Sequence, residues 1–115
     1  MREELGKVQL RNEYSIFELT AGYEVYHRDR RGQTFSQIIP SNIVESAHAE
    51  LAGNDWRVKD AADRLHVIAS DQDWPFSFGY KLQFFVQAIL VVLVAVGRAE
   101  YEGEERGFLY TVHGL

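Results

Sequence analysis

One long apolar stretch, residues 84–97, constrains the fold of this chain more than any other feature. Gln87 is the only polar side chain within it, and the nearest charges lie outside it, at Lys81 and Arg98. A helix needs about 20 residues to span a bilayer, whereas residues 82–97 supply only 16. We therefore predict a helix over residues 77–97 that is buried at the centre of a small core, and no membrane span.

Length and composition fit one domain. The chain has 115 residues, a common size for a single domain, and 46% of them are apolar, which is enough to build a core. We find no repeat or linker, so we expect one domain over residues 1–115, made of an N-terminal β region (1–40) and a helical unit (41–115). The first residues are polar and lack the pattern of a secretion signal, so we expect a cytoplasmic protein.

Cysteine content and net charge narrow the possible functions. The chain contains no cysteine, which excludes disulfides, thiolate catalysis and zinc sites built on thiolates. Its formal net charge of -5 disfavours a protein that coats nucleic acid through its overall charge. A local basic patch on an acidic domain is still compatible with nucleic-acid binding.

The N-terminal region has the pattern of antiparallel strands. Residues 1–7 are charged and predict a frayed terminus. Alternating, aromatic and β-branched residues then predict strands within residues 8–39, separated by a turn at residues 21–22 and a polar tip at residues 28–33. We expect a hairpin or a three-stranded meander that Pro40 ends.

Residues 41–112 predict helices followed by a hairpin. A first helix, residues 41–51, has Ser41 or Asn42 as its predicted N-cap. A short extended piece at residues 56–58 and an amphipathic helix at residues 59–68 come next. After the long apolar helix, Gly97 predicts a stop, and the residues beyond it predict a two-stranded hairpin.

This order of elements resembles the winged helix-turn-helix family. The resemblance is carried by residues 55–65, similar to the short strand and second helix of the family, and by residues 86–101, similar to the end of its third helix and the turn before the wing. Residues 106–112 would be the returning wing strand. These motifs are patterns of residue class, and the expected fold is α+β: a winged-helix-like three-helix unit with a C-terminal β-hairpin wing, preceded by the N-terminal antiparallel strands.

The resemblance implies a small DNA-binding module, a transcriptional regulator or accessory protein that reads duplex DNA with its third helix and wing. The residues it implies for the groove are Ser77, Tyr80, Lys81, Gln83 and Gln87. Those it implies for the wing are Arg98 and Arg106, and those for phosphates on the second helix are Lys59 and Arg64. Arg28, Arg30 and Arg31 form the densest basic cluster and are a further phosphate-binding candidate beside the simpler interpretation as a solvated turn.

Two features of the sequence differ from those expected of a DNA-binding winged helix. The third helix has one lysine and no arginine, and its outward positions include Phe84, Ala88, Val91 and Val92, which predicts burial of a second face by the N-terminal strands or by a partner subunit. The wing tip is acidic, which repels phosphates. The alternative is therefore a protein-interaction or assembly module that binds a protein partner and no nucleic acid. For the DNA-binding module we expect a homodimer, because two-fold pairing would bury the apolar face of the third helix.

No pattern in the sequence predicts catalysis or a bound metal. The four histidines show no metal-ligand spacing. The carboxylates at Asp71 and Asp73 lack the glycine and the terminal glutamate of a calcium loop, so we expect them to cap helices and turns. No nucleophile elbow or phosphate-binding glycine loop is present, so we predict neither an enzyme nor a cofactor.

Overall fold

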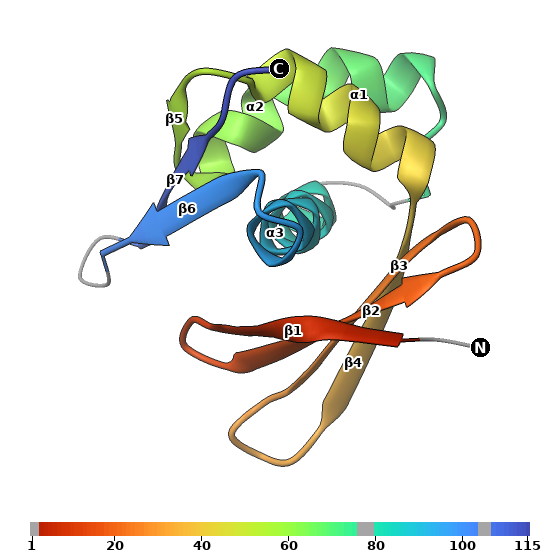
Figure 1. Ribbon diagram of the computed structural model, residues 1–115, viewed down its shortest axis with the longest axis vertical. Helices are drawn as coiled ribbons and strands as arrows, with labels where there is room; N and C mark the ends of the chain where they lie inside the picture. The colour runs from red at the N-terminus through yellow and green to blue at the C-terminus, as the bar shows by residue number, and fades with distance from the viewer. Residues whose placement is uncertain (1–2, 76–79, 104–106) are drawn as a thin grey trace.

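The long apolar stretch forms helix α3 (Tyr80–Ala95), which lies between a four-stranded sheet on one side and two further helices on the other (Figure 1). The computed structural model describes residues 3–75, 80–103 and 107–115. The strands of the large sheet are β1 (Glu3–Gln9), β2 (Glu13–Leu19), β3 (Gly22–Arg28) and β4 (Thr34–Pro40). The remaining elements are α1 (Ser41–Leu51), β5 (Asp55–Trp56), α2 (Val58–Asp71), β6 (Ala99–Glu102) and β7 (Leu109–Val112). The α+β class predicted from the sequence is confirmed.

The large sheet is an antiparallel meander with the order β1-β2-β3-β4, one strand more than the sequence predicted. The prediction of a frayed terminus was wrong from Glu3 onward, because Glu3–Gln9 pairs with β2 along its length. The charged residues suggested a frayed terminus because β1 is an edge strand, and its charged side chains, Glu3, Glu4 and Lys7, are exposed. The polar tip between β3 and β4 and the end of β4 at Pro40 are where they were predicted.

Helix α1 begins directly at the end of β4. The prediction that Ser41 or Asn42 caps it was wrong: Pro40 is the N-cap residue, and no side chain caps the helix. The Ser41 N–H instead donates to the Ala21 carbonyl in the β2–β3 turn, at 3.0 Å. A contact distant in sequence thus replaces the local cap, and it fixes the helix to the sheet.

Gly97 ends α3 as predicted. It has a φ of 79°, in the left-handed region that glycine adopts without strain. The Arg98 N–H donates to the Leu93 carbonyl at 2.7 Å, and the Gly97 N–H donates to the Val94 carbonyl, which together form a Schellman motif. The chain then enters β6, which joins β7 and β5 in a second sheet of order β5-β7-β6.

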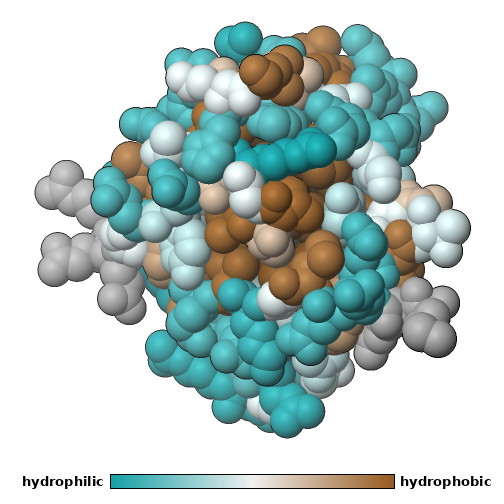
Figure 2. Space-filling model, in the orientation of Figure 1, coloured by the Kyte–Doolittle hydropathy of each residue, from teal (hydrophilic) through white to brown (hydrophobic). Residues whose placement is uncertain are grey.

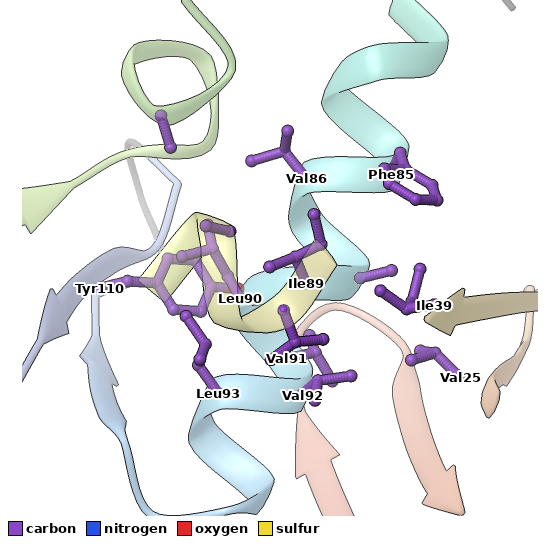
Figure 3. Close-up of a cluster of buried hydrophobic side chains, with 14 of the residues drawn as sticks. Val25, Ile39, Phe85, Val86, Ile89, Leu90, Val91, Val92, Leu93 and Tyr110 are labelled. Carbon is purple, nitrogen blue, oxygen red and sulfur yellow. The ribbon is translucent and has the colours of Figure 1, made fainter. Parts of the chain in front are cut away.

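The core surrounds most of α3, but Gln83 and Phe84 are exposed. On the face of the molecule seen in Figure 2, apolar side chains gather at the centre between polar side chains above and below. Val86, Ile89 and Leu90 are fully buried, as are Val91, Val92 and Leu93 on the following turn (Figure 3). The large sheet, helices α1 and α2 and strand β7 also contribute residues that have no exposed surface. These residues are Ile16, Ile39, Ala47, Leu51, Ala61, Leu65 and Tyr110.

The prediction that a second face of this helix is buried is confirmed for Ala88, Val91 and Val92, and the N-terminal strands pack against α3. It was wrong for Phe84, whose side chain is 55% exposed. Complete burial of one large aliphatic side chain contributes about 1.5–3 kcal/mol, so the interface between sheet and helix is a major source of stability. Among residues 3–75, 80–103 and 107–115, no helix has both the length and the apolar composition required to cross a membrane.

Candidate functional site

Of the residues predicted to read a DNA groove, the structure describes the side chains of Gln83 and Gln87. Ser77 lies outside the described residues, as do the side chains of Tyr80 and Lys81. Gln83 is exposed, but Gln87 is half-buried, and its Nε2 donates a hydrogen bond of 2.7 Å to the Tyr14 hydroxyl of β2. The sheet therefore contacts the helix face on which Gln87 lies.

Two of the predicted phosphate-binding cations, Arg64 and Arg98, are engaged in other contacts. Arg64 donates to Glu50 on α1 at 2.6 Å, and Arg98 donates to Glu45 at 2.7 Å. Arg98 also lies 3.4 Å from Nδ1 of His48, a buried histidine whose Nε2 lies 3.0 Å from the His113 carbonyl oxygen. Arg98 thus ties α1 to the start of β6.

The remaining predicted cations are distributed over different regions. Arg106 lies outside the described residues, and Lys59 is exposed at the start of α2. Arg28, Arg30 and Arg31 are exposed at the β3–β4 turn, which lies across α3 from α2 (Figure 1). Asp29 organises that turn, because its Oδ1 accepts the N–H groups of Arg31 and Gln33, each at 2.9 Å. The described cations therefore do not share one face.

The most distinctive exposed surface is the β4 edge, which we define as strand β4 with its two exposed apolar side chains, Phe35 and Ile38. In the sheet formed by the described residues, β4 pairs only with β3. None of its seven residues is charged, and Phe35 and Ile38 are 41% and 60% exposed. Strands at sheet edges usually carry charges or bulges that prevent pairing with another chain. The β4 edge has neither.

The exposed aromatic ring on this edge is held in place by its neighbours. Phe35 stacks on His27 at a ring distance of 5.0 Å, and His27 contacts Tyr14 at 4.6 Å. Burial lowers the pKa of His27 below its ordinary value, and Asp29 partly opposes this effect. Beside β4, Gln37 approaches the Phe84 carbonyl at 3.5 Å, and the Phe84 side chain is 55% exposed. Three large apolar side chains are therefore exposed on or next to β4.

A cavity of about 500 Å³ lies where the β1–β2 turn, the start of α2, helix α3 and the β6–β7 hairpin meet. Tyr14 and Tyr110 both line it. Burial raises the pKa of each hydroxyl above the ordinary value for tyrosine, so both are neutral hydrogen-bond donors at physiological pH. The Tyr110 hydroxyl is buried and has no hydrogen-bond partner among the described residues.

Neither a metal site among the described residues nor a similarity to a known protein explains the β4 edge and the cavity. In the described part of the chain, no group of three or more histidines and carboxylates is placed to hold a metal ion. Comparisons with protein-family models, with curated proteins and with solved structures found no match to this chain. The β4 edge and the cavity therefore carry the evidence for a function.

Sequence reasoning missed both features for different reasons. The β4 edge has a signal in the sequence, since seven consecutive strand residues without charge are unusual for a strand at a sheet edge. The pattern could not show that β4 is an edge strand, because strand order depends on tertiary pairing. The cavity has no local signal, because its lining residues come from segments as distant as Arg11 and Phe108.

Proposed function

We propose that this protein is an assembly module that binds a partner strand along the β4 edge, and that the partner is a second copy of the same chain. An extended strand added to a sheet edge forms main-chain hydrogen bonds, and the exposed side chains give specificity. The observation that carries the proposal is the uncharged seven-residue β4 with Ile38 60% exposed.

A second copy fits this edge for two physical reasons. Each molecule carries a net charge of -5, and two copies repel one another least where they meet at a surface without like charges. The β4 edge has no charge, and antiparallel pairing around a two-fold axis would place the same strand on both sides of the interface. The opposite edge, β1, carries Glu3, Glu4 and Lys7 and a register irregularity between Glu4 and Gly6, features that discourage strand addition.

We also propose that residues 41–115 form a winged-helix-like unit. The element order α1-β5-α2-α3-β6-β7 and the sheet order β5-β7-β6 support this assignment. DNA reading by the third helix stays a prediction, and the contacts of α3 with the sheet argue against it. Fold similarity alone does not give a function, and here the third helix is at the centre of the core.

Sedimentation velocity over a range of protein concentrations tests the proposal. We expect a reversible monomer–dimer equilibrium that Ile38→Lys shifts towards monomer, with a dissociation constant raised at least about tenfold, equivalent to about 1.4 kcal/mol. Val67→Lys is a matched control, because Val67 is an apolar residue on α2 with 64% exposure. It should leave the equilibrium unchanged.

A monomer at all concentrations would overturn the self-association proposal. Equal effects of Ile38→Lys and Val67→Lys would place the interface elsewhere. Selection from a randomised duplex library tests the DNA prediction independently, since specific binders exceed their own non-specific affinity by roughly a thousandfold or more.

A further inference from the structure

The cavity beside α2 brings together several hydrogen-bond donors from separate parts of the chain. Its volume of about 500 Å³ is within the roughly 300–1,000 Å³ that is common for small-molecule sites. Its wall is largely apolar and aromatic, and includes Leu10, Val58, Phe84 and Phe108. Such a wall favours a ligand with an apolar body.

The first turn of α2 is at the cavity. Arg57 is the N-cap residue and makes no side-chain cap hydrogen bond, and Val58 and Lys59 line the cavity. The first intrahelical bond runs from the Ala61 N–H to the Arg57 carbonyl, so the N–H groups of the preceding positions have no acceptor within the helix. These N–H groups and the helix dipole favour an anion at this position.

Tyr110 supplies an independent indication of a ligand. It has no exposed surface, it lines the cavity, and its side chain extends from β7 towards α3 (Figure 3). Its hydroxyl lacks a hydrogen-bond partner among the described residues. A buried polar atom without a partner destabilises a fold, so a ligand that offers an acceptor to this hydroxyl would gain a hydrogen bond there.

Among the described residues that line the cavity, the charged side chains are all cations, and the one acidic residue in the first turn of α2, Asp60, is not among them. Arg11, Arg57 and Lys59 line it, and the described lining residues include no carboxylate. Arg57 donates to the Gly107 carbonyl at 3.1 Å, which holds its guanidinium against the wing. Tyr14 accepts the hydrogen bond from Gln87, so its own O–H proton is directed to another acceptor.

We propose that this cavity binds a small organic anion, with its carboxylate or phosphate oxygens at the start of α2 and the Tyr110 hydroxyl and its apolar body against the aromatic wall. The proposal does not depend on strand pairing at β4, because none of the residues that line the cavity belongs to β4. Both head groups present the same anionic oxygen chemistry, and the choice of probes below distinguishes them.

The test is an NMR titration of the 115-residue chain with four probes: benzoate, phenyl phosphate, benzamide and inorganic phosphate. We expect one or both aromatic anions to shift the amide signals at the start of α2 and to bind at least about tenfold more tightly than benzamide or inorganic phosphate. Which anion binds more tightly identifies the head group.

Two tyrosine variants separate ligand binding from fold stability. Tyr110→Phe removes the hydroxyl without a partner, so we expect an unchanged fold and roughly tenfold weaker binding of the preferred anion. Tyr101→Phe is the control, because its hydroxyl donates to the Gln9 carbonyl at 3.1 Å and Tyr101 is not among the residues that line the cavity. It should leave anion affinity unchanged.

Three outcomes would overturn the proposal. The first is the absence of any shift at the start of α2 with both aromatic anions at about 10 mM, which corresponds to a negligible affinity. The second is equal binding of benzamide and benzoate. The third is wild-type affinity in Tyr110→Phe.

Discussion

The two edges of the large sheet differ in how they meet solvent. Both β1 and β4 bury side chains in the core, through Val8 at 3% exposure and Ile39 at 0%. On their open sides, β1 presents charges and a register irregularity, whereas β4 presents neither. Charge and irregular pairing are the usual protection against strand addition. This difference is the basis of the proposal that β1 remains an edge and that a partner strand covers β4.

The largest expected change in stability follows from substitutions on the core-facing sides of β1 and β4. Ile39→Ala should lower the free energy of unfolding by about 2–5 kcal/mol, because it leaves a cavity beside α3. Val8→Ala removes fewer carbon atoms and should cost about 1–2.5 kcal/mol. Urea denaturation of both variants measures the two costs. A loss below about 1 kcal/mol for Ile39→Ala would mean that β4 is not anchored on the core as described.

A smaller effect should follow when the protection of β1 is removed. The double variant Glu4→Thr/Lys7→Thr makes this edge less charged and raises its strand propensity, so self-association should strengthen by a few-fold. The ion pair that it loses, Lys7 with Glu13 at 3.5 Å, is exposed and contributes little.

Analytical ultracentrifugation measures the change in self-association. Lys59→Gln/Asp63→Gln is the control, because it removes one exposed acid and one exposed base from α2. Stronger association in the control as well would show that charge removal, and not the β1 edge, is responsible.

The smallest expected effect is a pH dependence confined to the β4 side. Burial lowers the pKa of His27 in the folded protein below its ordinary 6.5, so the unfolded chain binds a proton more readily. Stability should therefore fall slightly as pH decreases through 6.5 and level off below the folded pKa. Thermal unfolding between about pH 5 and 8 measures this change.

His27→Gln should reduce that slope, whereas the exposed His66→Gln, on α2, should preserve it. An unchanged slope in His27→Gln would assign the pH dependence to another group. Strand β1 contains no histidine, so no comparable effect is expected there.

The sequence predicted the elements that have local signals. The apolar stretch, the stop at Gly97 and the amphipathic helix α2 follow from periodicity and from glycine chemistry, and the structure confirms them. The first strand could not be predicted, because its polar residues acquire strand structure only through pairing with β2. Likewise, the cap of α1 is replaced by a hydrogen bond to Ala21, and Gln87 bonds to Tyr14, 73 positions away. Such contacts have no local pattern, and the candidate site depends on them.

Hydrogen–deuterium exchange at low and high protein concentration tests the central claim most directly, because it reads the main-chain amides of both edges in one experiment. The account predicts that amides of residues 34–39 exchange more slowly at high concentration, while those of β1 are unchanged. Ile38→Lys should abolish the difference. Identical exchange of β4 at both concentrations, or protection that develops on β1 instead, would contradict the assignment of β4 as the assembly edge.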